Sequence, residues 1–239
     1  MNKEEFSKIL SQKLEEIQIF LTEEKIEKFY IYMQKLLEWN EKINLTAIVE
    51  PEEIIKKHFV DCLTISSEIL NNSRVIDVGS GAGFPGIPLK ILREDIEILL
   101  LDSLNKRVNF LNEIIQELKL QKIKAIHFRA EECGQNLLYR EKFDVATSRA
   151  VANMSTLSEY LLPFVKVGGK AIYMKGNNIE EELETSKKAI SILGGEIKEI
   201  KEITFAGGDI KRNIVLVDKI AFTPNKYPRN QGKPTKSPL

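Results

Sequence analysis

The sequence predicts an α/β domain with a mostly parallel sheet, preceded by a helical N-terminal extension. From Arg74 onward, short apolar runs that suit buried strands alternate with longer amphipathic segments, and this alternation is typical of βαβ units. The first run leads into a glycine-rich stretch over 79–86, which favours a tight turn at the end of a strand. Before residue 70, apolar residues recur at helical spacing instead.

Residues 1–70 are expected to form a helical subdomain packed on the core. Apolar residues from Ile26 onward follow i, i+3, i+4, i+7 spacing, and Thr22 with the acids after it suits the start of that helix. Pro51 fits the first position of another helix, which carries His58 and Asp61 one turn apart. For these two side chains we favour a structural hydrogen bond over a role in orienting an acceptor.

The α/β domain is expected to span residues 71–222. Its strands are predicted, in chain order, at 75–78, at 97–102, from 123, and at 143–148, 170–175, 196–205 and 213–220. Helices are predicted around 87–93, 104–118, 157–165 and 179–193, the third of them stopped by Gly168 and Gly169. The last two strands are predicted as an antiparallel pair joined at 207–209, which places an antiparallel strand near the edge of the sheet. The basic, proline-containing tail 223–239 is expected to be extended or loosely ordered.

Two kinds of ligand compete for the glycine-rich turn. Gly81, Gly83 and Gly86 match the G-x-G-x-x-G pattern of dinucleotide-binding turns. The stretch 76–83 instead matches in full the apolar, acid, apolar, Gly-x-Gly-x-Gly pattern of S-adenosylmethionine-dependent methyltransferases. Counted from the strand end, a dinucleotide turn requires glycine where Phe84 stands. We therefore favour S-adenosylmethionine and a Rossmann-like class I methyltransferase sheet.

Acidic side chains at three neighbouring strands extend the predicted site. Asp77 lies inside the first strand, where a buried carboxylate needs compensation, either from the sulfonium and ammonium groups of the cofactor or from amides of the turn. Asp102 ends the second strand and suits the two ribose hydroxyls, although it could instead cap the next helix. After the third strand, the Ala130 backbone and the Glu131 side chain are expected near an adenine edge.

Composition and charge restrict the class of protein. The 239 residues hold 35 Lys and Arg against 35 Asp and Glu, so the chain is not a polycation. The stretch 219–239 contains basic residues without any acid, and it suits either phosphate contact or a solvated tail without a partner. No apolar run reaches the roughly 20 residues that cross a bilayer, and the N-terminus lacks a secretion signal. Cys62 and Cys133 match no metal spacing. We expect a cytoplasmic monomer without a metal.

Two signatures of base methylation are absent from the sequence: an Asn-Pro-Pro-Tyr or Asp-Pro-Pro-Tyr motif for exocyclic amines, and a cysteine pair for attack at pyrimidine C5. The acceptor is therefore expected to need neither amine orientation nor covalent activation. Guanine N7 meets this condition, because its lone pair carries no proton at neutral pH. Catalysis would then depend on positioning and electrostatics, without a general base.

Five motifs occur in order along the chain, at 39–46, 58–63, 77–86, 102–107 and 148–152. Their combination resembles the 16S rRNA guanine-N7 methyltransferase family, the RsmG-like proteins formerly called glucose-inhibited division protein B, over nearly the whole chain. The resemblance implies methyl transfer from S-adenosylmethionine to a guanine in the 530 loop of 16S rRNA, either free or in a small-subunit particle. It also implies cofactor contacts from residues in and beyond the turn, namely Gly79, Phe84, Ala130, Glu131 and Arg149.

Basic side chains supply the candidates for RNA contact, namely Lys106, Arg107, Lys175, Arg212, Lys226, Arg229, Lys233 and Lys236. Lys175 ends the fifth strand at the open edge of the sheet and is, with Arg149, a candidate for positioning the substrate. The planar guanidinium of Arg149 could bind a cofactor carboxylate or an RNA phosphate. The alternative is a salt bridge to a nearby acid. Two rival functions stay open on the sequence: a nicotinamide-dependent oxidoreductase, and a non-catalytic RNA-binding protein on a methyltransferase scaffold.

Overall fold

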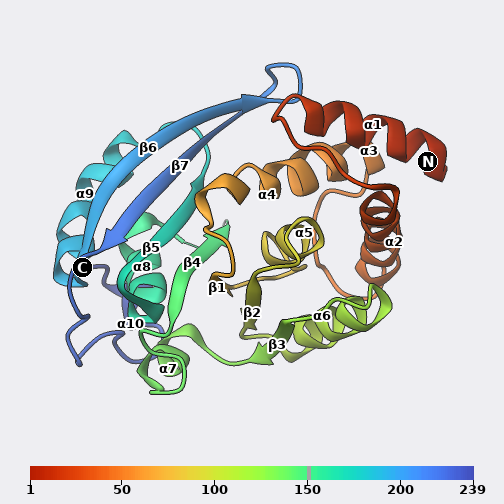
Figure 1. Cartoon of the computed structure of the whole chain (residues 1–239). Coiled ribbons are helices and arrows are strands. Elements are labelled where there is room, and N and C mark those ends of the chain that lie inside the picture. Colours follow the sequence, from red (N-terminus) through yellow and green to blue (C-terminus); the bar gives the residue numbers. More distant parts are fainter. Residues whose placement is uncertain (150–151) are drawn as a thin grey trace.

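A seven-stranded sheet forms the centre of the protein (Figure 1) in the computed structural model, which describes residues 1–149 and 152–239. The strands are β1 (Arg74–Val78), β2 (Glu97–Asp102), β3 (Ile123–His127), β4 (Phe143–Arg149), β5 (Val165–Lys175), β6 (Gly195–Phe205) and β7 (Ile210–Lys219). Their order is β3-β2-β1-β4-β5-β7-β6, with β7 antiparallel to both neighbours and the other pairs parallel. The predicted fold class is therefore confirmed. Ala150 and Val151, part of the 148–152 motif, lie outside the described residues.

Helices cover both faces of the sheet (Figure 1). They are α1 (Lys3–Glu15), α2 (Glu23–Asn40), α3 (Pro51–Ile54), α4 (Asp61–Leu63), α5 (Gly86–Leu92), α6 (Asn105–Glu117), α7 (Ala130–Gln135), α8 (Met154–Leu161), α9 (Glu180–Ile192) and α10 (Lys233–Lys236), with a π-helical segment (Ile55–Val60) between α3 and α4. One hydrophobic cluster joins the N-terminal helices, α5 and α6 to one sheet face, and a second joins α8 and α9 to the other. None of these helices is long and apolar enough to cross a membrane.

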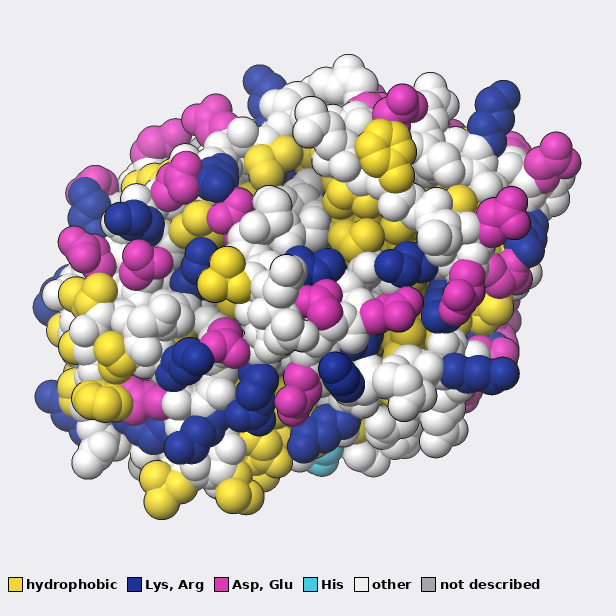
Figure 2. All heavy atoms as spheres, in the orientation of Figure 1, with side chains coloured by type: hydrophobic (Ala, Val, Ile, Leu, Met, Phe, Trp, Pro, Cys, Tyr) yellow, Lys and Arg dark blue, Asp and Glu magenta, His cyan; other side chains and the backbone are white. Residues whose placement is uncertain are grey.

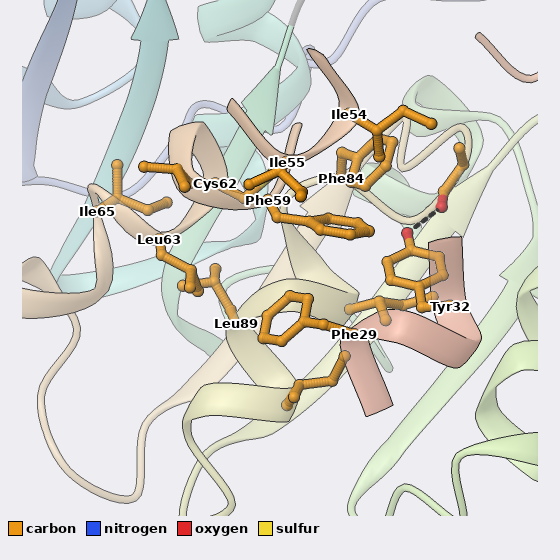
Figure 3. Close-up of a cluster of buried hydrophobic side chains, with 14 of the residues drawn as sticks. Phe29, Tyr32, Ile54, Ile55, Phe59, Cys62, Leu63, Ile65, Phe84 and Leu89 are labelled. Atoms are coloured by element: carbon orange, nitrogen blue, oxygen red, sulfur yellow. Dashed lines mark hydrogen bonds between the residues drawn. The ribbon is translucent and has the colours of Figure 1, made fainter. Parts of the chain in front are cut away.

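The N-terminal helices share their core with the glycine-rich turn (Figure 3). Phe29 and Tyr32 of α2 pack on Phe59 of the π-helical segment, with ring centroids 5.0 and 5.4 Å away. Phe59 in turn lies 6.3 Å from the ring of Phe84. The Tyr32 hydroxyl donates a hydrogen bond to the carbonyl of Ala82 in the middle of the turn. The helical extension therefore contacts the turn directly.

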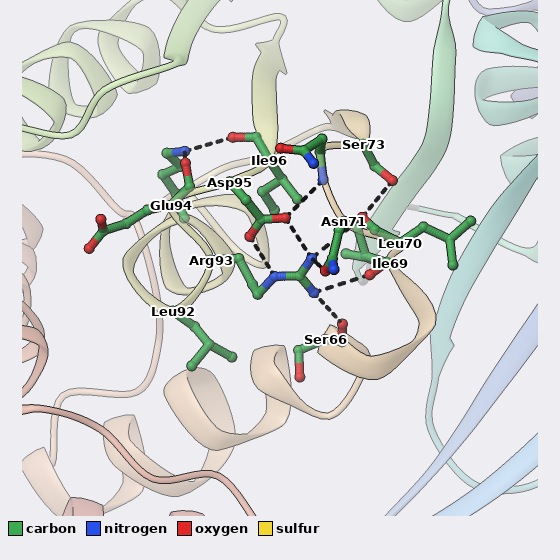
Figure 4. A network of polar contacts seen from close by, with 12 residues as sticks. Ser66, Ile69, Leu70, Asn71, Ser73, Leu92, Arg93, Glu94, Asp95 and Ile96 are labelled. Carbon is green, nitrogen blue, oxygen red and sulfur yellow. Dashed lines mark hydrogen bonds and ion pairs between the residues drawn. The ribbon is translucent and has the colours of Figure 1, made fainter.

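Arg93 binds the chain segment that leads into β1 (Figure 4). Its guanidinium donates to the two carboxylate oxygens of Asp95 at 2.7 and 2.8 Å, and to the backbone carbonyls of Ser66 and Ile69 at 3.3 and 3.1 Å. Asp95 also accepts a hydrogen bond from the Asn72 amide at 2.9 Å. Because one guanidinium holds several carbonyls at once, the route into β1 and its turn is well defined.

The helix predicted at 157–165 differs from the structure at its start, and its last residues form a 3₁₀ helix (Leu162–Phe164) after α8. Helix α8 begins at Met154, because the Asn153 side chain caps it by accepting a hydrogen bond from the Thr156 amide at 2.9 Å. Gly168 and Gly169 lie inside β5, where its pairing with β4 is irregular, and do not end a helix. A glycine pair suits a bulged strand as well as a helix end, and the sequence pattern does not separate the two.

The tail 223–239 is folded onto the domain, so the prediction of a loosely ordered segment is wrong. The buried Arg140 donates to the backbone carbonyls of Thr223 and Tyr227 at 2.6 and 2.7 Å. Arg229 pairs with Glu159, which is fully buried. Composition reveals the prolines and lysines of the tail, but not the buried side chains elsewhere in the chain that hold its backbone.

Candidate active site

The turn after β1 adopts a backbone that favours glycine at three positions. Gly79, Gly81 and Gly83 have φ values of 74°, 58° and 95°, in the left-handed region where other residues are strained. Gly86 begins α5, and a Cβ there would lie 2.9 Å from a carboxylate oxygen of Asp77. The sequence therefore shapes a turn of bare backbone at the carboxyl end of β1.

Two cavities meet at this turn and share Gly79 and Ser103 in their walls. The larger cavity, about 360 Å³, is lined by the turn, by Asp102, by the connection after α2 and by His58 of the π-helical segment. The smaller cavity, about 140 Å³, lies toward β3 and includes Ala130 and Glu131 in its wall. Both lie along the carboxyl ends of neighbouring parallel strands, which is where open α/β sheets bind ligands.

Asp77 lies beneath the turn and lines neither cavity. It is fully buried, and its Oδ2 accepts a hydrogen bond from the Gly86 amide at 2.9 Å. Its Oδ1 has no hydrogen-bond partner among the described residues. Burial raises the pKa of Asp77 to about 7. Of the two compensations that the sequence left open, the turn amide is present in the structure, so Asp77 holds the shape of the turn and reaches neither cavity.

Asp102 ties the turn to the start of α6. The side chain is 2% exposed, Oδ2 accepts from the Gly81 amide at 2.8 Å, and Oδ1 accepts from the Leu104 amide at 2.9 Å. Arg107, a predicted RNA contact, lies 3.7 Å from Oδ2 and lines the larger cavity with it. Leu104 is the N-cap residue of α6, and no side chain caps that helix, so the helix-capping alternative is not realised. A carboxylate offers about four acceptor positions, which leaves capacity for a ribose hydroxyl.

Arg149 is held by the helices that precede the sheet. Its guanidinium donates to Asp61 at 3.0 Å and to the Lys57 carbonyl at 2.8 Å, and it lies 4.7 Å from the centre of the Phe84 ring. His58 stacks on the same ring at 4.5 Å and contacts Arg149 at 2.9 Å. Burial and the Arg149 charge lower the pKa of His58 to about 3, so its ring is neutral at pH 7. The salt-bridge alternative for Arg149 is therefore present, within the wall of the larger cavity.

The structure divides the other predicted RNA-binding cations into two groups. Three already form ion pairs: Arg212 with Asp61, Lys175 with Glu182, and Arg229 with Glu159. Four side chains are exposed, namely Lys106, Lys226, Lys233 and Lys236. Figure 2 shows a face on which both signs of charge are interspersed, with Lys and Arg gathered over α7, α10 and the tail. This gathering lies next to the smaller cavity, whose wall includes residues of α7.

Sequence reasoning missed three side chains of the site. Thr46 shares a hydrogen bond of 2.8 Å with His58 and lines the larger cavity; its place at the end of the 39–46 motif was a usable signal. Tyr32 and Tyr160 carry no such signal, because helical spacing marks them only as core residues. Within residues 1–149 and 152–239, no cluster of three His, Cys, Asp or Glu side chains suits a metal ion.

Solved structures share the fold at low sequence identity. A mutant form of MtNAS matches with a TM-score of 0.56 and 15% identity, over 91% of this chain and 87% of that chain. TYW2 of M. jannaschii, solved in complex with AdoMet, matches with a TM-score of 0.51 and 15% identity, over 85% and 80%. At such identity these matches support the fold alone.

Sequence relatives cover nearly the whole chain. The ribosomal RNA small subunit methyltransferase G of Clostridium perfringens (strain 13 / Type A) is 56% identical over 219 residues, which are 91% of this chain and 92% of the relative. The protein of the same name from Clostridium tetani is 51% identical over 233 residues, covering 97% and 98%. The family model GidB, described as rRNA small subunit methyltransferase G, matches residues 25–215. The glycine-rich turn, both cavities and the helices that close them fall within that match, and the chain belongs to the rRNA small subunit methyltransferase G family.

Proposed function

We propose that this protein transfers a methyl group from S-adenosylmethionine to N7 of a guanine in the 530 loop of 16S rRNA. The observation that carries the proposal is the paired cavity at the positive-φ glycine turn, with Asp102 in the wall of the larger half. Family membership supports small-subunit rRNA as the acceptor. The protein would act in the cytoplasm as a monomer, because ribosomal subunits assemble there and one chain builds the whole crevice.

The residues of the crevice fit this cofactor. Asp102 has acceptor capacity for the ribose, the smaller cavity with Glu131 suits the adenine, and the larger cavity suits the methionine portion and the target base. When bound, the cofactor supplies an electrophilic methyl group on a sulfonium. Phe84, where a dinucleotide turn requires glycine, packs against both His58 and Arg149. That packing disfavours the oxidoreductase alternative.

The chain's own contribution to the reaction is positioning. Guanine N7 carries no proton at neutral pH, so no side chain needs to remove one. His58 is neutral and Phe84 presents an aromatic ring, and such surfaces suit stacking against a base taken out of an RNA loop. Arg149 is our candidate positioning residue, since Asp61 and Lys57 hold its guanidinium in the cavity wall.

In the test, the purified protein is incubated with radiolabelled S-adenosylmethionine and with either naked 16S rRNA or small ribosomal subunits. Both RNA substrates come from bacteria that lack the modification. Nucleoside mass analysis should show 7-methylguanosine, and comparison of the two substrates identifies the natural one. Label on another nucleoside would contradict the guanine-N7 assignment. Binding of both ligands without transfer would favour the non-catalytic alternative, and binding of NAD in place of S-adenosylmethionine would favour the oxidoreductase.

A further inference from the structure

The Thr46 hydroxyl lies in the wall of the larger cavity and makes two contacts within the protein. Thr46 belongs to the connection between α2 and α3, and it lines this cavity together with His58 and Phe84. Its Oγ1 accepts a hydrogen bond from the Ile48 amide at 3.0 Å and lies 2.8 Å from Nε2 of His58. A hydroxyl has two acceptor positions and one proton, so the tautomer of His58 decides what this hydroxyl can still offer a ligand.

The contacts of His58 assign its ring proton to Nε2. Nδ1 lies 2.9 Å from Nη2 of Arg149 and 3.1 Å from the Lys57 carbonyl. Because a guanidinium carries only donors, Nδ1 has to present its lone pair to Arg149. The Lys57 carbonyl accepts instead from Nη1 of the same guanidinium at 2.8 Å. The ring is neutral at pH 7, since burial and the Arg149 charge lower the pKa of His58 to about 3. Its single proton therefore lies on Nε2 and is donated to Thr46.

Thr46 is thereby left as a donor only. The Ile48 amide and His58 occupy both acceptor positions of Oγ1, and no acceptor for its proton lies within the described residues. Asn40, the last residue of α2, fixes Thr46 from both sides: Oδ1 accepts from the Thr46 amide at 2.9 Å, and Nδ2 donates to the Thr46 carbonyl at 3.0 Å. The cavity wall therefore holds a fixed hydroxyl donor that an acceptor on a ligand would satisfy.

We propose that Thr46 selects guanine by donating its proton to O6 of the base whose N7 receives the methyl group. This inference rests on the proposed methyl transfer to guanine N7. N7 and O6 lie on the same edge of guanine, whereas adenine carries a 6-amino donor beside its N7. Because neither acceptor position of Thr46 is available, an amino group would meet another donor there. Thr46 is thus a specificity-determining residue, and Arg149 supports it by fixing the tautomer of His58.

The test is a double-mutant cycle between Thr46→Val and the target base. Small-subunit rRNA carries at the target position either guanosine or 2-aminopurine riboside, which keeps N7 and lacks O6. The value of kcat/KM is measured for both RNAs with both proteins, and the 2-aminopurine RNA also serves as a competitive inhibitor of guanosine methylation. Thr46→Val should lower kcat/KM for guanosine about tenfold and leave transfer to, and inhibition by, the 2-aminopurine RNA unchanged. The different reactivity of the two bases cancels, because it is the same for both proteins.

Two variants and one spectrum serve as controls. Thr46→Ser keeps the hydroxyl and should methylate guanosine within about twofold of the wild type. In Thr185→Val the same change is made on the exposed face of α9, outside both cavity walls, and neither RNA should be affected. The chain contains two histidines, so His127→Gln assigns their signals in NMR of ¹⁵N-histidine-labelled protein. The spectrum should show His58 protonated at Nε2 and unprotonated at Nδ1.

The outcomes separate this inference from the function on which it rests. An equal loss on both RNAs in Thr46→Val would overturn it, because Thr46 would then act only by supporting His58. Unchanged guanosine methylation, weaker binding of S-adenosylhomocysteine by that variant, or a proton on Nδ1 of His58 would overturn it as well. All these results leave the methyltransferase proposal intact. If the wild-type protein transferred no methyl group to guanosine N7, the proposed function itself would fail.

Discussion

Arg229→Ala is expected to lower the free energy of unfolding by about 3 kcal/mol. Glu159 is fully buried and accepts three hydrogen bonds from the Arg229 guanidinium at 2.7 to 3.1 Å, with a fourth from its backbone amide at 2.6 Å. Alanine removes the first three and leaves a buried charge with one donor. Breaking such a pair from one side costs about 3–5 kcal/mol. The Arg229 side chain is 16% exposed, so water partly replaces it and the lower figure applies.

Urea and thermal unfolding followed by circular dichroism measure this loss. For a chain of this size, about 3 kcal/mol corresponds to a midpoint lower by about 6–12 °C. Lys236→Ala is the control in the same tail: its side chain is exposed, so the change should stay within about 0.5 kcal/mol. Arg229→Met combined with Glu159→Met removes both charges and should recover most of the stability.

Two results would refute this reasoning. If Arg229→Ala left stability unchanged but weakened RNA binding, the guanidinium would serve the substrate, as the sequence had suggested. If the double methionine variant were no more stable than Arg229→Ala, the uncompensated charge of Glu159 would not be the cause of the loss.

Three further predictions concern the turn and the tail. The pKa of Asp77 is raised to about 7, so the folded state holds its proton between pH 4 and 7 and the unfolded state does not; stability should therefore fall as pH rises through this window, by at most about 4 kcal/mol. In Asp77→Asn, the midpoints of urea unfolding measured between pH 4.5 and 7.5 should no longer fall as pH rises. An unchanged pH dependence would contradict the raised pKa of Asp77. Tyr32→Phe removes the hydrogen bond to Ala82 and should weaken S-adenosylhomocysteine binding about fivefold. Tyr173→Phe, which removes a buried bond to Ser158, should lower stability but leave that affinity unchanged in calorimetry. Replacing Lys226, Lys233 and Lys236 with alanine should weaken rRNA binding and reduce the slope of log K against log salt by about 2 to 3; an unaltered slope would exclude the tail from the RNA surface.

Local patterns in the sequence were sufficient to predict the architecture and the end of the sheet at which the candidate site lies. Strand and helix periodicities are properties of neighbouring residues, so the α/β order was predictable. The glycines at 79, 81 and 83 and the acid at 102 mark the carboxyl ends of two adjacent strands, and parallel pairing brings those ends together. The motif at 58–63 likewise placed His58 and Asp61 on one side of a helical segment, where both contact Arg149.

Only the tertiary structure decided which charged and polar groups form hydrogen bonds or ion pairs within the protein itself. Glu159 and Arg229 are 70 residues apart in the chain, and Asp61 and Arg212 are 151 apart, so no local pattern relates either pair. The contact of Tyr32 with the turn and the docking of the tail beside Glu131 have the same origin. The reason is physical: periodicity reports which face of an element is apolar, whereas the partner of a buried polar group is set by packing between distant segments.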